Sequence, residues 1–130
     1  MNFKFHHIGI VVNSIEQYEK QMLPNKKVRE VIDKIQNSKL ALYENFNESY
    51  IELIEPLNEN STSFNSLKKF GNHLNHLCYK VGPFSELENF MRDRKWIKVF
   101  GPVPAALFEN QKVVFYLNRN SQLIEFIISE

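Results

Sequence analysis

Hydrophobic and polar positions divide the chain into β-type runs and amphipathic helical stretches, in an order that occurs twice. The first half predicts four strands, at 3–12, 27–35, 39–45 and 50–55, with a helix at 14–22 after the first strand. The second half predicts strands at 75–81, 96–103, 112–117 and 122–128, with a helix at 84–94. Each half therefore has the order βαβββ.

The two halves also repeat their polar residues. A histidine opens the first strand of each half, in HIGIVV from His7 and in HLCYKV from His76, and a methionine follows each histidine by fifteen residues. The last strands, SYIELIEP and SQLIEFII, both place Ile-Glu within an apolar run. The histidines are 69 residues apart, and Glu52 and Glu125 are 73 apart. An internal repeat explains these similar offsets most simply.

The repeated glutamates predict a metal site. Glu52 and Glu125 are surrounded by large apolar residues, and an unpaired buried carboxylate costs roughly several kcal/mol. The repeat brings His7 and His76 to equivalent positions beside them. Two imidazoles and two carboxylates suit one divalent ion such as Ni, Zn, Co, Fe or Mn. No HExxH or CxxC motif occurs in the sequence. A single histidine or glutamate in a strand is usually solvent-facing or hydrogen-bonded, so the prediction of a metal site depends on the internal repeat.

The segment between the halves, at about 58–73, predicts a short linker helix that ends at Gly71. No low-complexity tract or long linker interrupts the chain. We therefore expect a single α+β domain of two tandem βαβββ modules. Module one covers about 1–57 and module two about 74–130.

Composition narrows the possible partners. The net charge of +1 over 130 residues shows no excess of basic residues for nucleic acid or an anionic membrane. No apolar run approaches the roughly 18 residues that span a bilayer, and the N-terminal residues lack the layout of a signal peptide. The single cysteine, Cys78, excludes an internal disulfide framework. A cytoplasmic location is expected.

With these motifs in view, the sequence resembles the vicinal oxygen chelate superfamily, which includes glyoxalase I, methylmalonyl-CoA epimerase, extradiol dioxygenases and bleomycin-resistance proteins. The similar segments are HHIGIVVNSIE, YIELIEPLNENS, LNHLCYKV and SQLIEFI, and they are most similar to the epimerase and glyoxalase I branch. The resemblance implies that the two modules form a curled mixed sheet around a divalent ion. Its ligand positions fall on His7, Glu52, His76 and Glu125.

The resemblance also implies chemistry. In this branch a metal stabilises an enolate while a carboxylate moves the proton on the carbon next to a carbonyl group, and Glu125 corresponds to the carboxylate that serves as ligand and base. Epimerases use a second carboxylate, and Gln36 falls at or near its position. Glutamine is not a base, and Asp33 would need a shift in register. Two-base epimerisation is therefore in doubt, whereas one-base isomerase or lyase chemistry remains open.

Other residues have weaker expected roles. The segment VPAALFENQKVVFY resembles a loop over the substrate entrance, so Phe108, Gln111 and Lys112 are expected to contact the substrate. His6 and His73 are expected to be exposed, and Cys78 to pack in the core. The resemblance implies an acyl-CoA thioester or a glutathione hemithioacetal as substrate, and a homodimer.

Two other functions remain open. A metal-free ligand-binding module of the bleomycin-resistance type has the same fold but usually lacks the four ligands. An extradiol dioxygenase needs two histidines, one carboxylate and open positions on iron, which four protein ligands fit poorly. Metal analysis separates the binding module from both enzymes.

Overall fold

The computed structural model describes residues 1–45 and 48–129, whose strands form one sheet. The strands are β1 (Lys4–Val11), β2 (Lys26–Asp33), β3 (Ser38–Glu44), β4 (Tyr50–Pro56), β5 (His73–Val81), β6 (Ile97–Pro104), β7 (Lys112–Leu117) and β8 (Leu123–Ile128). The helices are α1 (Ile15–Glu19), α2 (Phe64–Phe70), α3 (Phe84–Asp93) and a 3-10 turn, η2 (Ala106–Phe108). Apart from η2 and small shifts at element ends, this is the predicted order.

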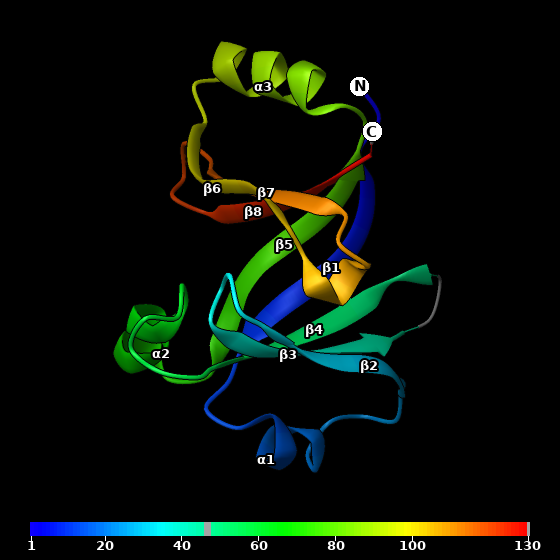
Figure 1. The fold of residues 1–130 in the computed structure, drawn as a ribbon, viewed down its shortest axis with the longest axis vertical. Coiled ribbons are helices and arrows are strands. Elements are labelled where there is room, and N and C mark those ends of the chain that lie inside the picture. Colours follow the sequence, from blue (N-terminus) through cyan, green and yellow to red (C-terminus); the bar gives the residue numbers. More distant parts are fainter. Residues whose placement is uncertain (46–47, 130) are drawn as a thin grey trace.

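The strand order shows how the two βαβββ units join. It is β2-β3-β4-β1-β5-β8-β7-β6, so the units meet edge to edge through the antiparallel pair β1 and β5. Inside the units, β1 pairs in parallel with β4, and β5 in parallel with β8. Figure 1 shows β1 and β5 running side by side between the two halves of a strongly curled sheet. The predicted fold, α+β with two βαβββ modules in a curled mixed sheet, is confirmed.

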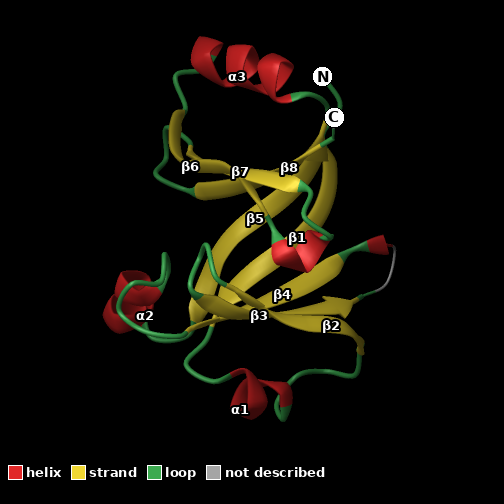
Figure 2. Cartoon of the chain, viewed as in Figure 1, coloured by secondary structure: helices red, strands yellow, loops and turns green. Residues whose placement is uncertain are grey.

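The helices lie outside the curl of the sheet, with α1 beside one half and α3 beside the other, whereas η2 lies inside it (Figure 2). Although η2 belongs to the second unit, it contacts β2 and β3 of the first. Separate apolar clusters lie between α1 and its half of the sheet, around Ile15 and Leu53, and between α3 and its half, around Leu87 and Phe126. The remaining cluster fills the inside of the curl.

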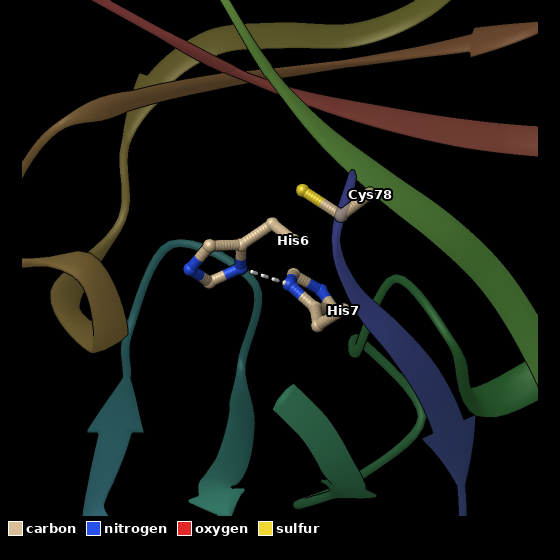
Figure 3. A group of neighbouring side chains, drawn as sticks. All are labelled: His6, His7 and Cys78. Carbon is tan, nitrogen blue, oxygen red and sulfur yellow. Dashed lines mark hydrogen bonds between the residues drawn. The ribbon is translucent and has the colours of Figure 1, made fainter. Parts of the chain in front are cut away.

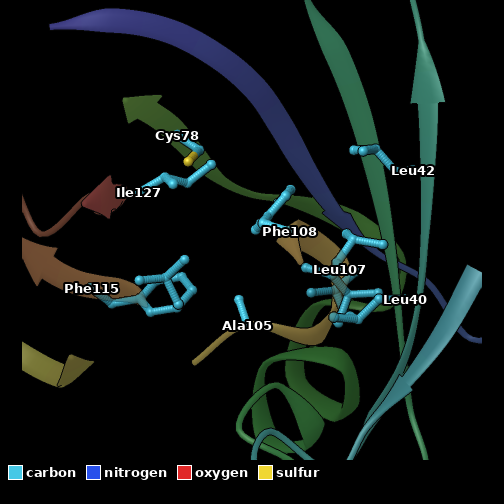
Figure 4. Close-up of a cluster of buried hydrophobic side chains, with 11 residues drawn as sticks. Leu40, Leu42, Cys78, Ala105, Leu107, Phe108, Phe115 and Ile127 are labelled. Carbon is cyan, nitrogen blue, oxygen red and sulfur yellow. The ribbon is translucent and has the colours of Figure 1, made fainter. Parts of the chain in front are cut away.

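This inner cluster joins the two units. It combines β3 with the segment around η2 and with the strands of the second half (Figure 4). Its labelled members are Leu40, Leu42, Cys78, Ala105, Leu107, Phe108, Phe115 and Ile127. Burying apolar side chains from both halves stabilises the curl, because flattening the sheet would expose them to water.

Local signals set the helix ends. Ser14 is the N-cap of α1, and its hydroxyl accepts a hydrogen bond of 3.2 Å from the backbone N–H of Gln17. The helix ends at Glu19, earlier than predicted, and the N–H groups of Gln21 and Met22 bond the carbonyls three residues back, as in turns. Gly71 follows α2 with a φ of 68°, as its predicted role as a stop requires.

The sequence NFNES at 45–49 predicts a turn between β3 and β4, and Phe46 and Asn47 within it lie outside the described residues. Its ends are joined by a 2.8 Å hydrogen bond from the N–H of Asn45 to the carbonyl of Ser49. Within the described residues, no helix combines the length and the hydropathy needed to cross a membrane.

Candidate metal centre

Four adjacent central strands each supply one side chain to a buried cluster. His7 comes from β1, Glu52 from β4, His76 from β5 and Glu125 from β8. All four point into the curl of the sheet, and none is more than 5% exposed. The structure therefore brings together the four residues that the internal repeat predicted as ligands.

The atoms at the centre of the cluster lie at regular distances. His7 Nε2 lies 3.2 Å from Glu52 Oε1 and 3.1 Å from Glu125 Oε1. His76 Nε2 lies 3.3 Å and 3.0 Å from the same two oxygens. The two Nε2 atoms are 3.2 Å apart. Two imidazole nitrogens and two carboxylate oxygens thus converge on one point.

These distances fit a shared metal ion. Two ligands at about 2.1 Å from one ion lie about 3.0 Å apart at a right angle and about 3.4 Å apart at the tetrahedral angle. Oε1 of Glu52 and Oε1 of Glu125 receive no well-formed hydrogen bond from any described residue. Buried polar atoms are normally satisfied, so these two oxygens could accept a bound cation between the two imidazoles.

Charge within the cluster shifts the pKa values in opposite directions. Burial disfavours the imidazolium of His76, but Glu125 and Glu52 outweigh burial and raise its pKa to about 10. The pKa of His7 is also raised, for the same reasons. Burial would raise the pKa of each glutamate, yet the two imidazoles hold both below the usual range. Without a metal, the site therefore keeps its carboxylates ionised by holding protons on histidine.

Gly9 is a site residue that the sequence analysis did not identify. A Cβ atom at this position would lie 2.2 Å from Cε1 of the His76 ring. The ring of His76 therefore occupies space that only glycine leaves open. The available signal was a glycine inside an apolar strand, which often marks the close approach of another group.

His6 corrects a prediction. We expected it to be exposed, but it is only 9% exposed, and its Nδ1 shares a 2.8 Å hydrogen bond with Nδ1 of His7. Burial and the adjacent His7 lower its pKa to about 4. The prediction was wrong because an extra residue in β1 at this point turns two consecutive side chains inward. His73 is only partly buried, and its Nδ1 bonds the carbonyl of Gly71 at 2.7 Å.

Cys78 is fully buried and belongs to the inner apolar cluster, as predicted. It shares the inward face of β5 with His76 and pairs in register with Glu125. Burial and the nearby carboxylates raise the pKa of its thiol well above the usual value. Cys78 is therefore a protonated thiol at neutral pH.

A cavity of about 320 Å³ adjoins the cluster at His76. Gln36, which the sequence placed near an epimerase base, lines it together with Ile54, Phe100, Phe115 and Leu123. In the described part of the chain, no lysine, arginine or carboxylate lines this cavity. Its walls therefore suit an uncharged group that reaches the cluster from one side.

The other three residues expected to contact substrate do not line this cavity. Phe108 stacks on the ring of His7 with their centroids 5.4 Å apart. With Gln111 it lines a separate cavity of about 230 Å³, on the side of His6. Lys112 is exposed at the start of β7. The structure thus places Gln36 on one side of the cluster and Phe108 and Gln111 on the other, whereas Lys112 lines neither cavity.

Asp33, the alternative to Gln36 as a second base, is held in the turn between β2 and β3. It is 2% exposed, and Oδ1 accepts hydrogen bonds from the backbone N–H groups of Ile35 and Gln36, at 2.9 Å and 3.0 Å. These bonds hold the carboxylate against the backbone. Gln36, rather than Asp33, presents its side chain to the cavity.

Solved structures share this fold. A hypothetical protein from Bacillus halodurans C-125 superposes with a TM-score of 0.87 at 28% identity, over 100% of this chain and 96% of that one. Methylmalonyl-CoA epimerase from Mycobacterium tuberculosis has a TM-score of 0.83 at 24% identity, over 98% and 88% of the two chains. A methylmalonyl-CoA epimerase in complex with methylmalonyl-CoA and ammonium has a TM-score of 0.84 at 17% identity, over 99% and 96%.

The sequence comparisons assign the family. No curated protein matches the chain. The family model for the glyoxalase/bleomycin resistance protein/dioxygenase superfamily matches residues 6–115, which include three of the four cluster residues, His7, Glu52 and His76. Since that match covers most of the chain and the fold agrees, this protein belongs to the glyoxalase/bleomycin resistance protein/dioxygenase superfamily.

Proposed function

We propose that the protein is a metal-dependent isomerase or lyase that moves a proton on the carbon next to a carbonyl group. The observation that carries this proposal is the convergence of four buried ligand atoms beside a cavity that His76 lines. A divalent ion held by His7, Glu52, His76 and Glu125 would supply Lewis acidity to a substrate oxygen. The fold shared with methylmalonyl-CoA epimerases supports this class of reaction.

Glu125 is the residue that we assign as the base. Its pKa lies below the usual range, so the group is a carboxylate at neutral pH and can accept a proton. Its Oε1 faces the cluster, where a substrate oxygen and the adjacent carbon would lie. Glu125 would take the proton from that carbon and return it to the same face or to a neighbouring atom.

Gln36 favours chemistry with one base. Its amide lines the cavity, and an amide neither removes nor supplies a proton at neutral pH. Asp33 is tied to the backbone of its own turn. Isomerisation or lyase chemistry on a single face therefore agrees better with these side chains than two-base epimerisation, in which a second acid serves the opposite face.

The volume and the lining of the cavity beside His76 limit which part of a substrate can reach the cluster. An acyl-CoA thioester or a glutathione hemithioacetal could place two oxygens at the cluster and its small acyl group against Phe100, Phe115 and Leu123. The large charged part of either carrier would remain outside, because about 320 Å³ holds only a small group and no lysine or arginine of the described residues lines the cavity.

Metal content is the first test. Protein purified without a histidine tag and then supplied with Ni, Co, Zn or Mn should hold about one ion per chain. An ion content well below one per chain after each of these treatments would contradict the proposal. It would favour a metal-free ligand-binding module instead.

The second test follows deuterium uptake from solvent and chirality together, on acyl thioesters and hemithioacetals. We expect exchange of the proton next to the carbonyl with little inversion. Glu125→Gln should abolish exchange even under saturating metal, whereas Glu52→Gln, which changes a ligand but not the base, should keep part of it. Equal loss in both variants would contradict the assignment of Glu125.

The homodimer also stays a prediction, which light scattering can test.

A further inference from the structure

We propose that His6 and Asn75 are positioning residues that fix the orientation and the tautomer of the two cluster histidines. Each is the residue directly before a cluster histidine, His6 before His7 and Asn75 before His76. The proposal rests on the metal site described under the proposed function. It adds two residues outside the set of four ligands, of which Asn75 also lines the cavity beside His76.

Both cluster histidines are held in the same way. Nδ1 of His7 is 2.8 Å from Nδ1 of His6, and Nδ1 of His76 is 2.8 Å from Oδ1 of Asn75. Figure 3 draws the bond between His6 and His7 as a dashed line. In each ring, the opposite nitrogen, Nε2, faces the two carboxylates at 3.0–3.3 Å. The residue before each histidine therefore binds the nitrogen that points away from the cluster.

A pair of β-bulges makes this arrangement possible. In β1, Phe5 pairs with Tyr79 and His7 with Cys78, which leaves His6 as an extra residue. In β5, His76 pairs with Gly9 and Leu74 with Ile10, which leaves Asn75 as an extra residue.

In a regular strand, consecutive side chains point to opposite faces, so a residue could not bond the ring of the next one in this way. A bulge changes that alternation and redirects a side chain. Because both bulges fall on the residue before a cluster histidine, one local device serves both halves of the site.

His6 is held in place by its other neighbours. Its ring stacks on Tyr50, with centroids 4.7 Å apart, and meets Phe108 edge to face at 5.3 Å. These contacts come from β4 of the first unit and from η2 of the second. The acceptor for His7 is therefore fixed by packing.

Hydrogen-bond chemistry then determines the tautomers. A histidine that binds an ion through Nε2 is neutral and carries one N–H, and the carbonyl oxygen of Asn75 only accepts. In the metal-bound protein His76 would therefore donate from Nδ1 and keep its lone pair on Nε2. For His7 to present the same lone pair, Nδ1 must donate to Nδ1 of His6. Partners of this kind orient metal-bound histidines and raise their basicity.

The same side chains suggest an alternative, in which His6, His7 and Cys78 hold an ion of their own. The 2.8 Å between the two Nδ1 atoms argues against it. That separation is a good hydrogen bond but is shorter than the roughly 3.0–3.4 Å between two ligands of one ion.

The test compares paired substitutions in the full-length protein. His6→Phe keeps an aromatic ring but has no acceptor, and Asn75→Leu keeps the approximate volume but has no acceptor. His6→Asn and Asn75→Asp each retain an acceptor oxygen. His73→Phe is the matched control, because His73 lies on the same strand as His76 and bonds only the carbonyl of Gly71 among described partners.

Zinc affinity is measured by competition with a chelator, and the Nδ1–H protons of the zinc-loaded protein are observed by NMR. His6→Phe and Asn75→Leu should each weaken zinc binding by about 10- to 100-fold and lose the slowly exchanging Nδ1–H signal of the adjacent histidine. His6→Asn, Asn75→Asp and His73→Phe should stay within about threefold of the wild type, as expected when the acceptor is kept. If His6 and Asn75 had merely structural roles, the variants that keep an acceptor atom, His6→Asn and Asn75→Asp, would not retain zinc affinity.

Other results would overturn the proposal in recognisable ways. Unchanged affinity in both His6→Phe and Asn75→Leu would remove any positioning role. Two zinc ions per chain, one of them lost in Cys78→Ala, would assign His6 to a second metal site. A wild type that binds no zinc, cobalt, nickel or manganese would refute the metal site itself, which is a separate failure because it is measured before any variant.

Discussion

Each βαβββ unit supplies one histidine nitrogen and one glutamate oxygen to the cluster, but the two units differ in the residues around these atoms. Two residues after the cluster histidine, the first unit has Gly9 and the second has Cys78. A Cβ at Gly9 would collide with the ring of His76, whereas Cys78 fills the equivalent position with a buried thiol. Symmetry therefore holds for the ligands and fails in the packing beside them.

A second difference concerns the connections. The first unit joins β2 to β3 by the tight turn that holds Asp33 and Gln36, whereas the second joins β6 to β7 through η2, which crosses to β2 and β3. Phe108 of η2 covers the ring of His7, while His76 remains at the wall of the cavity of about 320 Å³. The repeat therefore forms the cluster, and its unequal loops leave different cavities on the two sides of it.

Removing a ligand should have the largest effect. His76→Ala should abolish stoichiometric metal binding and the proposed activity, because it deletes one of four ligand atoms. It should also lower the melting temperature of the metal-loaded protein, since an ion at 1,000 times its dissociation constant stabilises the native state by about 4 kcal/mol. Titration calorimetry and thermal unfolding measure the two effects. Unchanged affinity in this variant would remove His76 from the ligand set.

Gly9→Ala tests the first asymmetry. The new Cβ must displace the ring of His76, because the nearest ring atom is 2.2 Å away. We expect metal affinity to fall by about 100-fold, at the upper end of effects from disturbed ligand orientation.

Cys78→Ala is the matched control at the equivalent position. It should leave affinity within about threefold and cost about 1 kcal/mol of stability, as loss of a small buried group does. If Gly9→Ala and Cys78→Ala changed metal affinity equally, the two units would not differ in how closely these positions pack against the cluster histidines.

Gln36→Glu tests the second asymmetry. If the amide limits the wild type to one base, a carboxylate here should raise the rate of methylmalonyl-CoA inversion by about tenfold or more, since a positioned acid or base typically contributes 10²–10⁴-fold. Chirality and deuterium uptake are followed together. Rapid inversion by the wild type would show that another group, such as Asp33, supplies the second proton.

The smallest effect concerns protons. With a pKa of about 10, His76 is protonated at pH 7 in the metal-free protein, so metal binding should release about one proton or more. Calorimetry in buffers of different ionisation enthalpy counts the protons released. Binding should also strengthen as the pH rises, because protons compete with the ion.

The metal-free protein should show the opposite trend. The stability that His76 contributes is complete below the unfolded pKa of 6.5 and disappears as the pH rises through about 10. The lowered pKa values of the glutamates contribute stability above 4.5 that is lost as the pH falls. Denaturant unfolding of metal-free protein between about pH 3 and 10 tests these signs. Stability that rises between pH 7 and 10 would contradict the contribution of His76.

The sequence by itself determined the order of the elements and the four residues of the cluster. Strand and helix periods depend on local spacing, and a repeat of His7 and Glu52 as His76 and Glu125 can be counted without coordinates. The capping roles of Ser14 and Gly71 are likewise local, because each acts on a backbone group within a few residues.

Only the tertiary structure decided what surrounds those four residues. His6 was predicted to be exposed because alternation in a regular strand turns it away from His7, and the bulge that reverses this depends on the register between β1 and β5. The need for Gly9 arises from a ring 67 residues further along the chain, and the division of Gln36 and Phe108 between two cavities depends on where η2 crosses the sheet. Contacts between strands distant in sequence have no local period, so the packing around the cluster could not be predicted by counting along the chain.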